Sequence, residues 1–128
     1  MNLEQQQKIV VEALENIKGH DIKVFDTQPL TSLFDRIIIV SGTSDRQTRA
    51  LAHEVAREAK KYGLDIIAME GENSGEWVLI DLGDIVVHCM QPAIRAYYQL
   101  EDLWGDHPIE LQIIQDTPMP VPEKNSKP

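Results

Sequence analysis

The chain has 128 residues, a single cysteine and a formal net charge of −9. This length gives one domain with a core of its own, and the lone Cys89 excludes an internal disulfide and fits a reducing compartment. Because no apolar run reaches the ~20 residues of a membrane helix and the N-terminus lacks a signal-peptide pattern, we expect a cytoplasmic protein that does not contact membranes.

The negative charge is concentrated in one part of the chain. Residues 64–116 contain eleven acidic side chains and one basic one, Arg95, whereas residues 1–63 contain nine of each. An acidic surface repels phosphate backbones, so we expect no direct nucleic-acid binding, and it attracts a basic protein partner. The alternative is an acidic face that only keeps the protein in solution.

Helices and strands alternate along most of the chain. The pattern predicts, in order, a helix between Asn2 and Gly19, strands over 21–27 and 36–40, a helix from Ser44 to about Tyr62, a strand over 64–69, and a third helix from Pro92 to about Trp104. The dense apolar run at 36–40 belongs in the middle of a sheet. A full helical crossover separates it from the strand over 64–69, so we expect these two strands to be parallel.

A β-hairpin is predicted over residues 76–90. Two apolar runs flank Leu82-Gly83, and Gly83 can adopt the positive φ of a tight turn. With that two-residue loop, the opposed pairs are Asp81 with Asp84, Ile80 with Ile85, Leu79 with Val86, Val78 with Val87, and Trp77 with His88. One face then carries the core residues Val78, Ile80, Ile85 and Val87. The other carries Trp77, Leu79, Asp81, Asp84, Val86 and His88.

The second face of this hairpin has the composition of a protein-docking surface. Two carboxylates placed opposite each other destabilise a sheet, so we expect a basic group of a partner to relieve the pair Asp81 and Asp84. An aromatic side chain beside aliphatic ones supplies an anchor if helices leave the face open. Alternatively Trp77 belongs to the core, and Tyr98 on the next helix either extends the face or fills the core.

The composition changes after the third helix, where five of the seven prolines lie beyond residue 105. We therefore divide the chain into an α/β domain over residues 1–107 and a proline-rich, largely disordered tail over 108–128. Alternation of Ile109, Leu111 and Ile113 is compatible with one further edge strand. The fold class is α/β, a single domain with a mixed sheet of about five strands covered by helices.

No catalytic, cofactor-binding or metal-binding set is expected. The four histidines lack metal-ligand spacing, and His88 and Cys89, as neighbours on a strand, point to opposite faces. The junction from Gly42 to Ser44 is able to hold a phosphate and is similar to the first turn of a nucleotidyltransferase fold. Those enzymes need two alternating carboxylates soon afterwards, and the only close pair, Asp81 and Asp84, comes some forty residues later.

One residue and three segments occur together in a characteristic order. They are Asp26, SGTSDR at 41–46, EGENSGEWVLIDLGDIVVH at 70–88 and IRAYYQLEDLW at 94–104. With these segments the chain resembles the Iojap family, the bacterial ribosomal silencing factors, over residues 3–105. It departs from that family at Arg36-Ile37, where aromatic or small apolar residues are common, and in its longer C-terminal segment.

The resemblance implies a non-enzymatic factor with a degenerate nucleotidyltransferase-like fold. Such a factor binds the large ribosomal subunit through its ribosomal protein fourteen, blocks joining of the small subunit and represses translation under nutrient limitation. The family's binding surface maps onto Trp77, Asp81 and Tyr98, to which the strand pairing adds Leu79, Val86 and His88. The resemblance also implies that the free protein can form a homodimer.

Two other functions are compatible with the sequence. One is a metal-dependent nucleotidyltransferase-like enzyme that uses Ser44 and the pair Asp81 and Asp84 with magnesium. The other is a dimeric adaptor whose open face serves only self-association.

Overall fold

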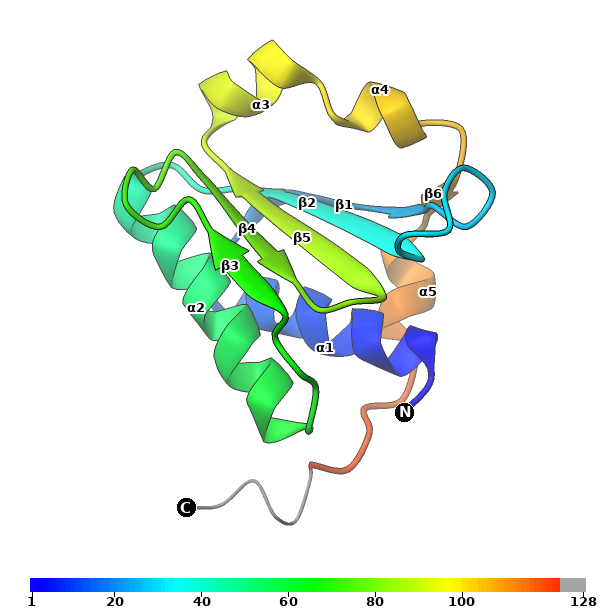
Figure 1. Ribbon diagram of the computed structural model, residues 1–128. Coiled ribbons are helices and arrows are strands. Elements are labelled where there is room, and N and C mark those ends of the chain that lie inside the picture. Colours follow the sequence, from blue (N-terminus) through cyan, green and yellow to red (C-terminus); the bar gives the residue numbers. More distant parts are fainter. Residues whose placement is uncertain (123–128) are drawn as a thin grey trace.

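A computed structural model describes residues 1–122, in which five helices and six strands follow one another. They are α1 (Leu3–Asn16), β1 (His20–Asp26), β2 (Arg36–Ser41), α2 (Asp45–Lys61), β3 (Ala68–Glu70), β4 (Trp77–Asp81), β5 (Ile85–Met90), α3 (Pro92–Tyr98), α4 (Glu101–Trp104), β6 (Pro108–Ile109) and α5 (Leu111–Gln115). The sheet lies between α1, α2 and α5 on one side and α3 and α4 on the other (Figure 1). Within the described chain, no helix is long and apolar enough to cross a membrane.

The strands form one mixed sheet in the order β3-β4-β5-β2-β1-β6. β2 pairs with β5 in parallel, and the other neighbours are antiparallel. The predicted mixed α/β sheet is confirmed, with six strands instead of about five. β3 runs in the same direction as β2, as expected, but β4 and β5 lie between them, so the two do not pair.

The larger core lies between the sheet and the layer of α1 and α2. It contains the predicted core face of the hairpin, since Val78, Ile80, Ile85 and Val87 are fully buried. All six residues of β2 are buried, which confirms that this strand is central. Alternation on β4 and β5 therefore directs one row of aliphatic side chains towards the two long helices.

A buried arginine ties the N-terminal helix to the sheet. Arg36 is 7% exposed, and its guanidinium donates hydrogen bonds to Asp26 Oδ1 at 2.8 Å and Gln7 Oε1 at 3.0 Å. A buried charge is tolerated where it is paired and hydrogen-bonded in this way. Arg36 thus joins β2 to β1 and α1.

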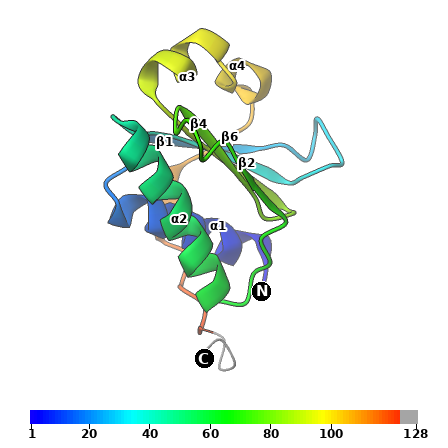
Figure 2. The ribbon, with the colours of Figure 1, turned by 60° about the vertical axis from the view of Figure 1, so that its left-hand side comes forward.

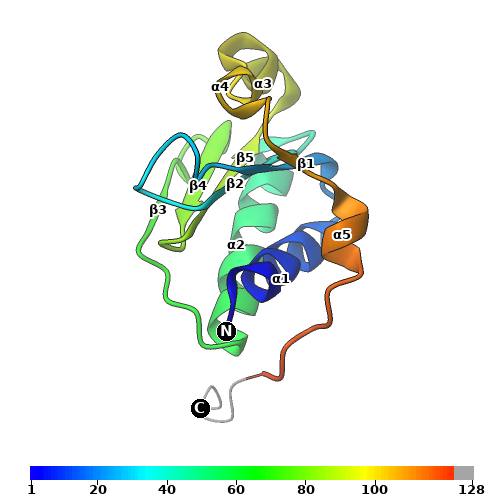
Figure 3. The ribbon, with the colours of Figure 1, turned by 90° about the vertical axis from the view of Figure 1, so that its right-hand side faces the viewer.

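Ordered elements continue past the boundary that we expected at residue 107. β6 pairs with β1 through Val24 and Ile109, as the edge-strand alternative proposed, but the residues after it form the helix α5. Ile114 on α5 is fully buried, and Lys8 Nζ donates to the carbonyl of Gln115 at 2.7 Å, so α5 lies against α1 (Figure 3). The remainder of the expected tail from residue 123 onward lies outside the described residues.

The predicted third helix is in fact two short helices. Gln99 takes a left-handed conformation, with φ of 48°, and separates α3 from α4. This break turns the chain so that Trp104 on α4 packs edge-on against Phe34, with 5.7 Å between the ring centroids. As a result α3 and α4 cover part of the second face of the sheet (Figure 2).

Candidate functional site

The hairpin of β4 and β5 has a different register from the predicted one. Trp77 pairs with Met90, Leu79 with His88, and Asp81 with Val86, so the predicted pairs are wrong by two residues. Leu82 N–H donates to the carbonyl of Ile85 at 2.9 Å, which makes Gly83-Asp84 the two-residue loop. Gly83, with φ of 91°, stands at the first loop position, as type II′ hairpin turns require. A shift of two residues leaves each side chain of β4 and β5 on its predicted face.

The two aspartates of the hairpin do not oppose each other. Asp81 Oδ1 accepts the N–H of Gly83 at 2.8 Å and so supports the turn. Asp84 lies in the loop, where its carbonyl oxygen accepts the N–H groups of Asp35 at 2.7 Å and Arg36 at 3.0 Å. The expectation that a partner relieves an unfavourable carboxylate pair is therefore wrong, because the pair does not form.

An apolar hollow of about 520 Å³ opens on the second face of the hairpin. We call it the docking hollow. It is lined by Leu33, Phe34, Ile67, Glu70, Leu79, Asp81, Gly83, Val86 and His88. Four of the six predicted site residues therefore lie in one depression. Leu79 and Val86 are only half-buried there, in contrast to the fully buried side chains on the other face of the same strands.

The other two predicted residues, Trp77 and Tyr98, form the helix-covered end of this face. Their ring centroids are 5.0 Å apart, and Tyr98 remains 53% exposed. Trp77 is half-buried and packs against the small core that contains Ile37, Ile39 and Met90. The face is thus roofed by α3 at Trp77 and open at Leu79, so neither the fully open nor the fully covered alternative describes it.

His88 connects the covered end to the docking hollow. It is 8% exposed, and its Nδ1 accepts a hydrogen bond from Trp77 Nε1 at 2.9 Å. Burial lowers the pKa of His88 from 6.5 to about 4, so the imidazole is neutral near pH 7 and carries its hydrogen on Nε2. The hydrogen bond fixes the indole and imidazole rings relative to each other.

Several residues that line the hollow are not among the site residues predicted from the sequence. Leu33 is 82% exposed and Ile67 is 64% exposed. Leu33 lies in the loop between β1 and β2, which projects beyond the strand ends (Figure 2). The sequence feature that could have identified this wall is the apolar pair Leu33-Phe34 in an otherwise polar connector. The predicted strand over 64–69 includes Ile67, but β3 begins only at Ala68, so Ile67 lies in the connector before it.

The surroundings of the hollow are acidic. Glu70 and Asp81 are part of its lining, and Asp84 is exposed in the adjoining turn. Arg95, the one basic residue of positions 64–116, is buried and paired with Glu101, so it does not offset this charge at the surface. The apolar hollow with an acidic border is suited to an apolar side chain flanked by basic ones.

The set required for the alternative enzyme does not assemble. Ser44 Oγ accepts the N–H of Gln47 at 3.0 Å as the cap of α2, and the next residue, Asp45, lies against Gly75. Asp81 is at the far end of β4, and the four steps along the strand from Trp77 to Asp81 span roughly 13 Å. Across residues 1–122 no cluster of three or more His, Cys, Asp or Glu side chains is placed to hold a metal ion.

Comparison with known proteins gives a consistent set of relatives. Residues 1–128 match the family model described as ribosomal silencing factor during starvation. The ribosomal silencing factor of Chromobacterium violaceum is 53% identical over 105 residues, which cover 82% of this chain and 86% of that protein. The one from Bacillus subtilis is 38% identical over 109 residues, covering 85% and 92%. A crystal structure of a Chromobacterium violaceum protein superposes with a TM-score of 0.81 at 53% identity, covering 82% of this chain and 88% of that one.

Proposed function

This chain belongs to the ribosomal silencing factor family, and from that membership we propose that it binds the large ribosomal subunit and represses translation when nutrients are limiting. The partner is ribosomal protein fourteen of the large subunit, as the sequence resemblance implies. The bound factor prevents the small subunit from joining. The names of the relatives support the silencing role, and the docking hollow supports a protein partner.

The observation that carries the proposal is the unroofed part of the hairpin face. Leu79 and Val86 are half-buried in a hollow whose wall residues Leu33 and Ile67 are mostly exposed. A monomer gains by covering such an apolar depression, and burial contributes about 25 cal/mol per Å² of apolar surface. Ribosomal proteins are generally basic, which matches the acidic border of the hollow.

Occupancy alone is sufficient for this mechanism. A 14.5 kDa protein seated on the joining surface of the large subunit excludes the small subunit by its volume, without any chemical step. The extent of repression then follows the free concentration of the factor relative to its dissociation constant. We accordingly propose a non-enzymatic protein.

Paired isoleucine substitutions test the docking hollow. Ile67→Arg places a bulky charge on its wall, whereas Ile113→Arg makes the same change on α5, where the side chain is 58% exposed. We expect Ile67→Arg to weaken co-sedimentation with isolated large subunits at least ~10-fold and Ile113→Arg to leave it unchanged. Equal binding of both variants, with unchanged circular dichroism, would contradict the placement of the site.

A second pair examines the opposite wall and the adaptor alternative. Leu33→Arg is compared with Leu103→Arg on α4, where Leu103 is 65% exposed. Loss of subunit binding in Leu33→Arg alone supports the proposal. If wild-type protein sediments only with itself and not with the large subunit, the face serves self-association and the dimeric adaptor is the better description.

A further inference from the structure

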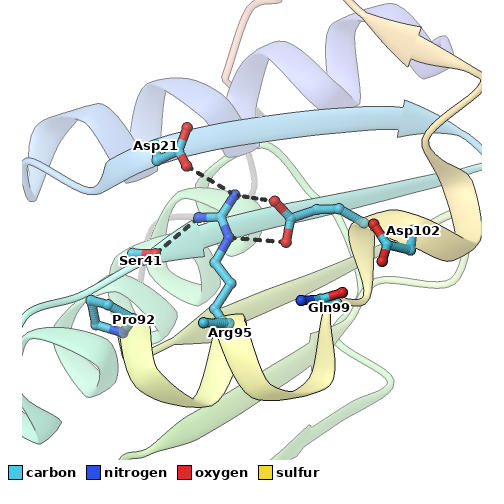
Figure 4. A pocket seen from close by; sticks show the side chains of 8 residues that line it. Asp21, Ser41, Pro92, Arg95, Gln99 and Asp102 are labelled. Atoms are coloured by element: carbon cyan, nitrogen blue, oxygen red, sulfur yellow. Dashed lines mark hydrogen bonds and ion pairs between the residues drawn. The ribbon is translucent and has the colours of Figure 1, made fainter.

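A buried arginine joins α3 to three other elements. Arg95 is 6% exposed, and its Nη1 donates to Ser41 Oγ at 2.9 Å. Its Nε and Nη2 donate to the two carboxylate oxygens of Glu101, both at 3.2 Å, and Nη2 lies 3.6 Å from Asp21 Oδ2. Figure 4 shows the guanidinium between these groups. Together they line a hollow of about 350 Å³.

The backbone is bent to bring these partners to Arg95. Gln99 has φ of 48° and reverses the chain between α3 and α4, which returns Glu101 to the guanidinium. Asp21, with φ of 52°, is also left-handed. Such conformations are disfavoured for residues other than glycine and persist where surrounding contacts impose them. Two of them at one ion cluster indicate that the cluster determines the local path of the chain.

The helix α3 has little else to hold it. It has seven residues, its N-cap Gln91 makes no side-chain capping bond, and Arg95 is its one buried residue. A helix of this length is unstable without tertiary contacts. The opposite side of α3 is exposed, as Tyr97 is 81% exposed. The rotation of α3 about its axis is therefore set largely by Arg95, with a contribution from the partly buried Ile94.

Tyr98 follows Arg95 by three residues and thus lies on a neighbouring side of the helix. The centroid of its ring lies 5.0 Å from the centroid of the Trp77 ring. We propose that Arg95 is a positioning residue that holds Tyr98 against Trp77 and so shapes the helix-covered end of the second face of the hairpin. This inference rests on the proposed function, in which the second face of the hairpin, the face that carries Trp77, is the binding surface.

Trp77 fluorescence gives a readout that does not depend on ribosomes. The protein has two tryptophans, so Trp104→Phe leaves Trp77 as the reporter. Trp104 Nε1 is buried without a hydrogen-bond partner, so this background loses no polar contact. In it, Arg95→Met should raise acrylamide quenching of Trp77 and shift its emission to the red, as Tyr98→Ala should. Arg95→Lys keeps the positive charge but loses the paired hydrogen bonds to Glu101, so its quenching and emission shift should be intermediate.

A double-mutant cycle separates positioning from general loss of structure. Arg95→Met should weaken large-subunit binding about 2- to 10-fold, the range of one aromatic contact, and should add nothing once Tyr98→Ala is present. Glu101 and Asp21 are 30% and 61% exposed, so water can solvate them after Arg95→Met. If Arg95→Met does not fold, Glu101→Gln loosens the same cluster and takes its place.

The outcomes distinguish this inference from the proposed function. Unchanged Trp77 quenching in Arg95→Met, or full additivity with Tyr98→Ala, would overturn the positioning role. Failure of the wild-type protein to bind large subunits would overturn the proposed function, while the fluorescence comparison would still decide the role of Arg95.

Discussion

His88 is the residue at which pH acts most directly on this fold. Burial lowers its pKa from 6.5 to about 4. As pH falls below 6.5 the unfolded chain binds a proton on this imidazole before the folded chain does, so the folded state loses stability. The stability that the neutral, buried His88 contributes is fully present above pH 6.5 and is lost progressively as the pH falls to about 4. Protonation of Nδ1 would also remove the acceptor for Trp77 Nε1.

We therefore expect the free energy of unfolding to fall by about 2 kcal/mol between pH 7.5 and pH 5 on account of His88 alone. His88→Asn keeps an acceptor near the Nδ1 position and does not titrate, so its stability should vary less over this interval. Urea unfolding at several pH values measures the difference. His20→Asn changes an exposed histidine and serves as the matched control. A pH dependence of the same size in His88→Asn would contradict the assignment.

At the scale of the elements, the hairpin shows what alternation predicts and what it leaves open. The order of apolar residues on β4 and β5 correctly predicted both faces, because side chains alternate strictly along a strand. The register was wrong because a slip of two residues preserves the faces, so only the turn decides between the alternatives. Glycine occupies the first loop position in the structure, whereas the prediction placed it second.

Gly83→Ala should destabilise the protein through the turn. The φ of 91° disfavours any residue with a Cβ, and the added methyl would lie 3.2 Å from Ile67 Cδ1, which can move aside. We expect a loss of about 1 kcal/mol, or a lowering of the melting temperature by roughly 3–5 °C. Gly83→Asn should cost less, since asparagine tolerates left-handed conformations better than alanine. Calorimetry on the three proteins measures this order, and equal melting temperatures would contradict it.

Two other elements were predicted less well, for reasons of tertiary contact. The division into α3 and α4 depends on Gln99, a residue type with no preference for left-handed backbone, and on ion pairs formed by Arg95. The helix α5 lies in a proline-rich segment, and it is held by burial of Ile114 and by Lys8 from the other end of the chain. Neither interaction is visible in a local pattern.

For the whole molecule, sequence reasoning identified four of the nine residues that line the docking hollow. The hairpin residues were identified because they share one strand pair and alternate. Leu33, Phe34 and Ile67 come from connectors, and only the folded sheet brings them beside Leu79 and Val86. Charge was predictable at this scale because it sums over the chain. Arg95, the one basic residue of positions 64–116, is buried and so does not reduce the acidity of the accessible surface of that part of the chain.

The acidic border should accelerate association with a basic partner. Glu70→Lys and Glu110→Lys alter the net charge equally, but only Glu70 lines the docking hollow. At low salt we expect Glu70→Lys to bind large subunits about 3- to 10-fold more slowly than Glu110→Lys. The difference should shrink at high salt, where screening shortens the reach of the charges. Stopped-flow binding over a range of ionic strength measures both effects, and equal rates at low salt would count against electrostatic steering.

The central position of β2 also governs the order of assembly while the chain is being synthesised. β1 is available as a neighbour at once, but β5, its partner on the other side, ends at Met90, 49 residues after Ser41. At 5–20 residues per second this interval lasts roughly 2–10 seconds. Throughout it, one edge of β2, whose residues 37–40 are all apolar, has unpaired backbone groups, the condition that favours aggregation. The nascent chain is therefore most vulnerable between the emergence of β2 and that of β5.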